Sequence, residues 1–323
     1  MKKEIVLATL AILFIAGCTG GQLPIEIPWI TSPTIFSGGG LVIETFEIDN
    51  TEVYNNRSAK ISMTITNKGG AQVPDGEALA LLQGSALRDD FASDGGLYWT
   101  ERGATDSVWE TMGKDMDPYD PVRDVPADEK IINWYLTSPT DIDPGTTRTD
   151  VFIGRLYYDY TTTVTGNVWI YTEAESDAAK AAGRSLNQNS FTSTAGPVAL
   201  YVTVKPTNVI VDGDQTFTLQ VKASSVGGGT VYSQGAVAYD GSDFEIDAET
   251  ELNMVDVTVS EVTGWTGEED CTDTLELTKG EATITCDVTV TDIPSTFRSD
   301  QLKVTAEYGY WVERTASVTV SGK

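Results

Sequence analysis

The sequence predicts an all-β fold built from two tandem β-sandwich domains, and two observations lead to this expectation. The first is the hydrophobic pattern: apolar and polar residues alternate along most of the chain, with many Val, Ile, Thr and Tyr. This period of two is typical of strands that bury one face. The second is an internal repeat. Only Asp177–Arg184 has a helical pattern, so helices are expected to contribute little.

The repeat is clearest near the start of each copy. Two short strand-like passages align without gaps with two later passages, at an offset of 156 residues: Thr51–Val53 and Ile61–Ile65 with Thr207–Val209 and Phe217–Val221. Polar turn residues fill the middle of both copies, and each copy then reaches a run of glycines. Each copy is therefore expected to begin with a strand, a turn and an alternating strand.

A Tyr-x-Tyr motif marks the end of each copy. Tyr158–Tyr160 corresponds to Tyr308–Tyr310 at an offset of 150 residues, and an alternating apolar stretch follows both motifs. We expect the motif strand to form a hairpin with that following stretch. Nearly equal offsets at both ends favour two copies of one β domain over chance similarity between alternating strands.

The repeat sets the predicted domain boundaries. The first domain covers residues 41–197 and holds a long insertion at about 85–144, where strand patterning is weak. The second covers residues 198–323, and Ala195-Gly196-Pro197 marks the junction. Regularly spaced short strands with turn signals predict a β-sandwich for each copy.

The opening motif LVIETFEIDNTEVYNNRSAKISMTITNKGG resembles the start of immunoglobulin-like modules in archaeal and bacterial surface proteins, including CARDB-type adhesion-related domains. The residues that carry the resemblance are Leu41, Ile43, Phe46, Val53, Ile61, Met63, Ile65, Asn67 and Gly69. It covers about a third of the chain. The long insertion departs from the compact members of this family. The resemblance implies an immunoglobulin-like fold and a role in adhesion or recognition.

The N-terminus predicts export and anchoring. Lys2 and Lys3 precede the apolar run Ile5–Ala16, which is too short to span a membrane and has the length of a signal-peptide core. Ile15-Ala16-Gly17-Cys18 follows and resembles the lipobox of prokaryotic lipoproteins, with Ile in place of the usual Leu. Residues 1–17 are thus interpreted as a lipoprotein signal peptide. The alternative is an ordinary signal peptide with an incidental cysteine.

The resemblance to lipoproteins implies that Cys18 is lipidated and becomes the mature N-terminus. Residues 18–40 are rich in Pro and Gly and have the composition of a linker. Two acyl chains would hold such a tether stably on a membrane, whereas one gives marginal binding. We therefore expect a protein at the cell surface, lipid-anchored on the outer face of the cell membrane.

Composition narrows the classes of function. The formal net charge is −27, with 21 basic and 48 acidic residues. A chain this acidic is not expected to bind nucleic acid, because such binding relies on cationic contacts to phosphates. The sequence contains no histidine, which excludes histidine-activated nucleophiles and histidine-ligated zinc. No pair of carboxylates stands out as catalytic, so the chain is predicted to be non-enzymatic.

Cys271 and Cys286 are the only cysteines after Cys18. They flank two alternating stretches joined at Lys279-Gly280, so we expect them to face each other across a hairpin. Exported proteins meet oxidising conditions, which favours a disulfide over two free thiols.

The insertion carries the candidate ligand-binding residues. The loop DMDPYDPVRD holds Asp115, Asp117, Asp120 and Asp124, whose carboxylates are the hard oxygen ligands that calcium prefers. This is the one cofactor hypothesis, and a solvated acidic loop is the alternative. The aromatic residues Tyr98, Trp99, Trp109 and Tyr119 are either a binding surface or packing that folds the insertion onto the sandwich.

Asn56-Arg57-Ser58 is a candidate glycosylation sequon at a predicted turn, with Asn56 as the acceptor. Two hypotheses for the whole protein follow. The first is a non-enzymatic surface lipoprotein that projects tandem domains toward a protein or glycan at the cell surface. The second is a subunit that self-assembles into an extracellular filament or surface layer through β-strand edges.

Overall fold

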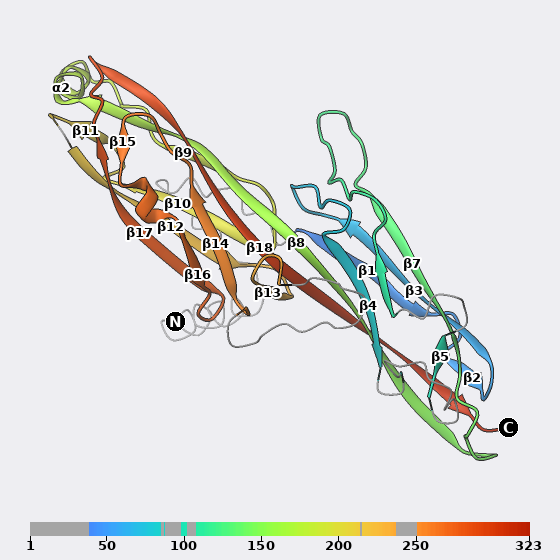
Figure 1. Ribbon diagram of the computed structural model, residues 1–323. Coiled ribbons are helices and arrows are strands. Elements are labelled where there is room, and N and C mark those ends of the chain that lie inside the picture. The colour runs from blue at the N-terminus through green and yellow to red at the C-terminus, as the bar shows by residue number, and fades with distance from the viewer. Residues whose placement is uncertain (1–38, 85–86, 88–97, 102–107, 214, 237–250) are drawn as a thin grey trace, which may run out of the picture. The chain divides into compact units, whose positions relative to one another are not determined.

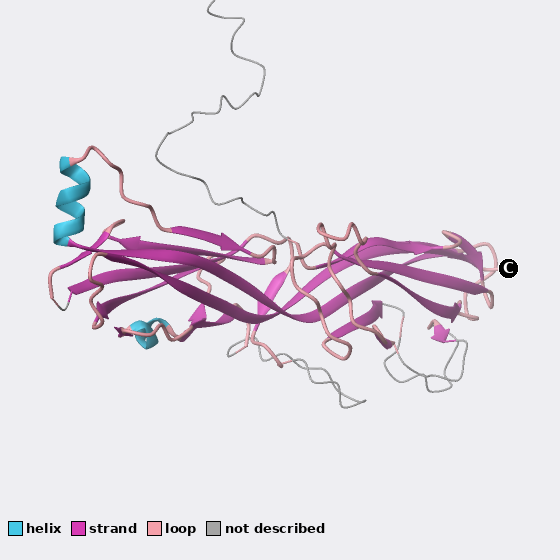
Figure 2. Ribbon diagram, turned by 90° about the horizontal axis from the view of Figure 1, so that it is seen from above, coloured by secondary structure: helices cyan, strands magenta, loops and turns pink. Residues whose placement is uncertain are grey.

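A computed structural model describes residues 39–84, 87, 98–101, 108–213, 215–236 and 251–323 (Figure 1). The predicted signal peptide, Cys18 and nearly all of the tether lie outside these residues. The predicted all-β fold is confirmed: the described part is mainly strand, with one α-helix and one short 3₁₀-helix (Figure 2). The α-helix, α2 (Glu173–Ala181), overlaps the predicted stretch Asp177–Arg184, and the side chain of Thr172 caps it by accepting from Glu175 N at 3.3 Å.

Two four-stranded sheets have matching orders. The first has the order β1-β3-β7-β5, formed by β1 (Leu41–Ile48), β3 (Ser58–Asn67), β7 (Glu129–Thr137) and β5 (Thr100–Glu101). The second has the order β10-β12-β17-β15, formed by β10 (Val198–Lys205), β12 (Gln215–Ser225), β17 (Glu281–Val290) and β15 (Trp265–Thr266). The two copies seen in the sequence therefore arrange their strands in the same order in these sheets.

A third, ten-stranded sheet contains strands from both copies. Its main path is β16 (Asp273–Glu276), β14 (Met254–Val259), β18 (Phe297–Ser321), β8 (Thr147–Thr172), β4 (Ala78–Gly84) and β6 (Trp109–Thr111). Four short strands complete it along the edges of β8 and β18: β2 (Glu52–Tyr54), β9 (Ser190–Ser193), β11 (Val209–Val211) and β13 (Thr230–Tyr232).

The long strands β8 and β18 run antiparallel to each other from Phe297↔Tyr171 to Ser321↔Thr147 (Figure 1). The prediction that each Tyr-x-Tyr motif ends in a hairpin is therefore wrong. The chain passes straight through both motifs, because the following stretch pairs with the other copy instead of folding back.

The short strands show that the two copies exchange their last strands. β2, from the first copy, pairs in parallel with the end of β18, and β11, from the second copy, pairs in parallel with the end of β8. The predicted junction at Ala195–Pro197 falls between β9 and β10. The division into two domains stays a prediction, since β8 and β18 each pair with strands of both copies.

The sheets pack face to face. A Cβ atom placed on Gly154 of β8 would meet the side chains of Met63 and Phe46, which come from β3 and β1. The inward residues of β3 alternate strictly with outward ones and are buried, as its hydrophobic pattern predicts. Burial of such alternating side chains between two sheets is the main stabilising contribution in a sandwich.

Four buried tyrosines mark the point where the two copies meet. Tyr160 lies opposite Tyr308, and Tyr158 lies opposite Tyr310, in the β8–β18 register. The Tyr160 hydroxyl accepts from Gly70 N at 2.9 Å and Ala71 N at 3.0 Å, and donates to the Ala195 carbonyl at 2.8 Å. Burial raises the pKa of these hydroxyls, so they stay neutral and hold the neighbouring loops.

The predicted insertion contains a strand of the fold. β7 pairs with β3 from Ser58↔Thr137 to Thr66↔Glu129, with Ile132, Trp134 and Leu136 pointing into the core. Residues 129–137 are thus part of the first sheet, and the irregular segment is shorter than expected. Within it, residues 85–86, 88–97 and 102–107 lie outside the described part of the chain.

Candidate functional site

The four candidate binding aromatics lie in different environments. Trp99 is buried, its Nε1 donates to Asp150 Oδ2 at 2.8 Å, and its ring meets Phe152 edge-on at 5.4 Å between centroids. Tyr98 is half-buried beside it. Tyr119 is 52% exposed, and its hydroxyl donates to Asp124 Oδ1 at 2.9 Å. Trp99 therefore serves packing, and Tyr119 stabilises its own loop.

Trp109 belongs to an aromatic cluster on the face of the large sheet opposite the main core, where Leu81, Ala236 and Leu252 pack with it. We call this cluster the central aromatic face: Trp109, Tyr157, Tyr232 and Trp311. The Tyr157 ring lies 6.4 Å from Trp109, 6.4 Å from Tyr232 and 5.7 Å from Trp311. Trp311 stacks on Tyr232 at 5.9 Å. The two tyrosines are buried and the two tryptophans are half-buried.

Sequence reasoning missed Tyr157, Tyr232 and Trp311, because they lie on three strands distant in the chain. One signal was present. Tyr157 and Trp311 sit immediately beside the two Tyr-x-Tyr motifs, so an outward aromatic residue accompanies each pair of inward tyrosines.

Charged groups border the central aromatic face. Arg155 Nε pairs with Glu313 Oε2 at 2.8 Å, across β8 and β18. Asp159 lies beside Tyr232 and accepts from Gly235 N at 3.2 Å. Burial, with a smaller contribution from the charge on Glu77, raises the pKa of Asp159 to about 6, while the bond from Gly235 opposes this change.

Asp159 gives a pH-dependent prediction. Its pKa is higher in the folded protein than its ordinary value of 3.8, so the ionised carboxylate destabilises the fold above pH 6, and the penalty disappears as the pH falls toward 4. The side chain is partly exposed, so the penalty is about 1 kcal/mol. Asp159→Asn should therefore raise the Tm by about 2–4 °C at pH 7.5 and leave it unchanged at pH 4.

Thermal unfolding followed by circular dichroism at both pH values measures this difference. Asp287→Asn, on the exposed outer surface of β17, is the matched control and should change the Tm at neither pH. An equal gain for Asp159→Asn at both pH values would contradict a charge effect.

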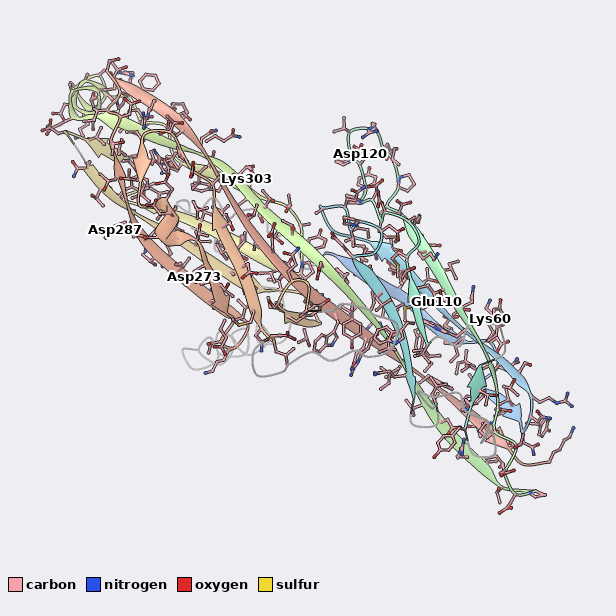
Figure 3. All side chains as sticks on the ribbon, in the orientation of Figure 1. Lys60, Glu110, Asp120, Asp273, Asp287 and Lys303 are labelled. Carbon is pink, nitrogen blue, oxygen red and sulfur yellow. A yellow bond between two sulfur atoms is a disulfide. The ribbon has the colours of Figure 1, made fainter. Side chains whose placement is uncertain are left out.

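The four candidate calcium ligands each have a partner of their own. Asp115 Oδ1 accepts from Asp75 N at 2.9 Å, and Asp117 Oδ1 accepts from Gln72 Nε2 at 2.6 Å. Asp120, labelled on its loop in Figure 3, accepts from the N–H groups of Val122 and Arg123, which hold its pKa below the ordinary value. Asp124 accepts from Tyr119.

Among the residues that the structure describes, no three acidic or cysteine side chains converge in a geometry that could hold a metal ion. The four aspartates instead shape the loop between β6 and β7. The calcium site stays a prediction, without support from their arrangement.

A disulfide joins Cys271 to Cys286, with Cα atoms 5.4 Å apart. The expected hairpin between them is wrong, because β16 pairs with β14 in the large sheet while β17 belongs to a four-stranded sheet. The bond therefore links the segment just before β16 to β17, in the other sheet. Cys271 ends the short 3₁₀-helix Glu268–Cys271 that leads into β16.

Asn56 lies in the turn between β2 and β3, where it is exposed and has a φ of 56°. The position is accessible, and its glycosylation stays a prediction. In the described part of the chain, no helix is long and apolar enough to cross a membrane.

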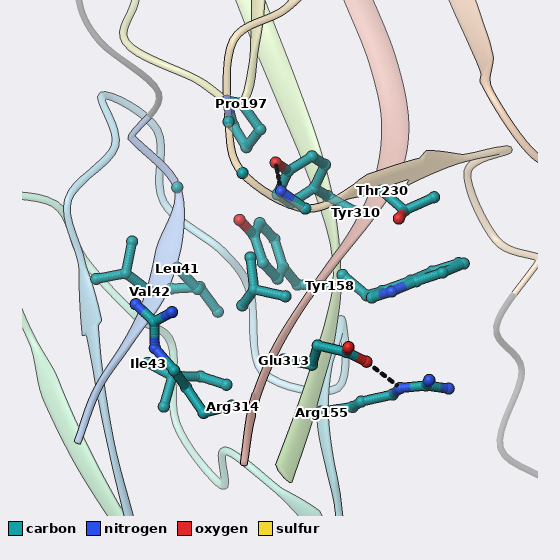
Figure 4. Close-up of a pocket in the computed structure, with 16 residues that line it drawn as sticks. Leu41, Val42, Ile43, Arg155, Tyr158, Pro197, Thr230, Tyr310, Glu313 and Arg314 are labelled. Carbon is teal, nitrogen blue, oxygen red and sulfur yellow. Dashed lines mark hydrogen bonds and ion pairs between the residues drawn. The ribbon is translucent and has the colours of Figure 1, made fainter. Parts of the chain in front are cut away.

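A groove of about 440 Å³ opens beside the β18 edge (Figure 4). Its walls come from the start of β1 (Gly40–Ile43), the loop Gly227–Thr230 and the stretch Tyr310–Arg314 of β18, with Tyr158 at its base. Tyr310 fixes the loop by accepting from Gly229 N at 2.6 Å.

No model of a known protein family matches this chain, and a search of curated proteins finds no match. The site must therefore be interpreted from its own residues.

Proposed function

We propose that this chain is a non-enzymatic cell-surface lipoprotein for adhesion or recognition, which binds a protein or glycan through the central aromatic face. Its immunoglobulin-like sandwiches would project from a lipid anchor at Cys18 on the outer face of the cell membrane. The observation that carries the proposal is the pair of half-buried tryptophans, Trp109 and Trp311, on an outward sheet face.

Aromatic rings suit this role because they combine a large apolar surface with few rotatable bonds. Trp311 is held by its contacts with Tyr157 and Tyr232, which are themselves buried. A ring fixed in this way loses little conformational freedom when a sugar ring or an apolar side chain stacks on it. Tryptophan is also enriched among residues that dominate binding energy at protein interfaces.

The strands beneath this face support its use as a binding platform. Tyr157 and Trp311 belong to β8 and β18 and lie opposite each other in a ladder that continues well past them on both sides. Binding groups on such paired strands are more fixed than groups on loops. The absence of histidine in the sequence and the structural engagement of the loop aspartates favour recognition over catalysis.

The test is a binding measurement on purified Cys18→Ser protein, with intact cells and a panel of immobilised oligosaccharides as probes. Trp109→Ala and Trp311→Ala should each weaken binding about tenfold, since one stacking contact contributes about 1–2 kcal/mol. Trp169→Ala is the matched control: Trp169 is also half-buried on the outward face of β8, but lies twelve residues along that strand from Tyr157. Unchanged binding by both tryptophan variants would overturn the proposed face.

A second candidate function is a subunit that self-assembles into an extracellular filament or surface layer. One observation favours it: part of the β18 edge has no partner strand among the described residues, and exposed edges accept strands from other chains. Electron microscopy of material sheared from cells would test it. Ordered filaments or sheets containing this chain would support assembly, and dispersed particles would contradict it.

A further inference from the structure

The outer edge of β18 is open over a defined stretch. The pairing of β13 with β18 ends at Thr230↔Trp311, and the pairing of β2 with β18 begins at Thr319. Between them, from Val312 to Val318, the described residues include no strand on that side, although β8 pairs continuously on the other. Along this stretch, the backbone N–H and C=O groups of alternate residues point to the open side, where the described residues supply no strand partner.

The corresponding stretch of β8 is covered. The offset of 150 that relates the Tyr-x-Tyr motifs places Val164–Asn167 of β8 at the position of Arg314–Ser317 of β18. β9 pairs antiparallel with Val164–Asn167. The two copies therefore differ at this edge: one has a strand there, and the other does not within the described part of the chain.

Side-chain burial shows the same difference. Thr162 and Val164 on the core side of β8 are 0% and 2% exposed. Their counterparts on β18 are Val312, which is half-buried, and Arg314, which is exposed. Around Val312 and Arg314, the core side of β18 is therefore more exposed than the matching part of β8, which β9 adjoins.

The groove described above lies along this open edge, and the chain enters the described part of the structure beside it. Gly40 and Leu41 line the groove together with Val312 and Arg314 (Figure 4). A segment of only a few residues before Gly39 would therefore be long enough to reach the open edge of β18.

Those residues match β9 in sequence. The offset of 156 that relates Val53 of β2 to Val209 of β11 places Thr34–Ser37 at the position of Ser190–Ser193. Ile35 then corresponds to Phe191, the residue by which β9 packs against the core. Glycines follow Ser37, as Thr194–Gly196 follow β9, and would allow the turn into β1.

We propose that Thr34–Ser37 pairs antiparallel with Arg314–Ser317 of β18 in the same chain, at the place that β9 takes on β8. In the transferred register Ile35 would lie opposite Ala316 on the core side of β18, as Phe191 lies opposite Gly166 on β8. The long Arg314 side chain would keep its guanidinium in solvent. The chain's own tether segment would then close the edge that a second copy could otherwise use. This inference is independent of the ligand of the central aromatic face.

A cysteine pair tests the proposal. In the β9–β8 register Thr192 lies opposite Thr165, which transfers to Phe36 opposite Thr315. Residues directly opposite in an antiparallel pair have Cβ atoms about 5 Å apart, within reach of a disulfide. Phe36→Cys with Thr315→Cys, in Cys18→Ser protein, should oxidise to an intramolecular bond in most molecules, seen as a monomer of altered mobility without reductant.

The matched control is Phe36→Cys with Lys303→Cys. Lys303 is exposed on the same face of β18, but it lies twelve residues from Thr315, or about 40 Å along the strand, and should form no monomeric bond. Covalent dimers or ladders in place of bonded monomers would overturn the proposal and show that a second copy's segment occupies the edge. Absence of any bond at Thr315 would overturn it as well.

Hydrogen exchange gives a second measurement that does not depend on cysteine chemistry. Ile35→Asp should speed exchange in peptides covering Val312–Val318 at least tenfold, because it removes the side chain that holds the segment in place. The matched Glu26→Asp change lies outside the proposed strand and should leave exchange there unchanged. Equal exchange in Ile35→Asp and unaltered protein would refute the pairing.

Discussion

Loss of the Cys271–Cys286 disulfide is expected to lower the free energy of unfolding by about 3 kcal/mol. The bond closes a sequence separation of 15 residues, for which the chain-entropy model gives a loss of about this size. The structure adds a second reason to expect an effect, because both cysteines are buried and belong to segments that lead into different sheets. Without the bond, only packing holds these two segments together.

Denaturant unfolding of Cys271→Ala/Cys286→Ala protein measures the loss against unaltered protein. Reductant distinguishes the bond from the small cavities left by alanine: it should destabilise the unaltered protein and have no effect on the double variant. Because β8 and β18 pair across both sets of strands, we expect a single unfolding transition to move as a whole. Equal stability with and without the bond would contradict its structural role.

The fold class could be predicted because strand patterning is a local signal. Ile61, Met63 and Ile65 alternate with polar residues, and all three are buried as that period requires. The repeat was also readable, since matching motifs at offsets of 156 and 150 reflect matching strand orders in the two four-stranded sheets.

The exchange of the last strands could not be predicted, because local patterns do not reveal distant pairing. An alternating stretch follows each Tyr-x-Tyr motif and was expected to fold back on it, with Gly166 and Asn167 between the two stretches in the first copy. In the structure these residues continue β8 and pair with Leu302 and Gln301. The pairing partner lies more than a hundred residues away in the chain, so no local pattern identifies it.

The candidate site was only partly predictable for the same reason. Trp109 was identified as an aromatic residue in an irregular segment, but its neighbours Tyr157, Tyr232 and Trp311 come from three other strands. The loop aspartates suggested calcium because carboxylates cluster in the sequence. In the structure, each has found a backbone or side-chain donor close to it, such as Asp75 N for Asp115.

Cys18→Ser is expected to move nearly all of the protein from the membrane to the medium. A two-chain lipid anchor holds a protein stably, at about 0.8 kcal/mol for each buried CH₂ group, and serine cannot carry this modification. The net charge of −27 gives no attraction to an anionic membrane surface that could replace the lipid. Release should therefore be nearly complete rather than partial.

Cell fractionation followed by immunoblotting measures the distribution, with Thr19→Ser as the matched control next to the modified position. The control should stay in the membrane fraction and dissolve in non-ionic detergent. If Cys18→Ser protein stays in that fraction, salt and detergent washes separate two causes. Release by salt would indicate a polar contact with another surface component, whereas release by detergent alone would indicate that the apolar segment Ile5–Ala16 remains as the anchor. Either result would contradict lipidation of Cys18 as the basis of attachment.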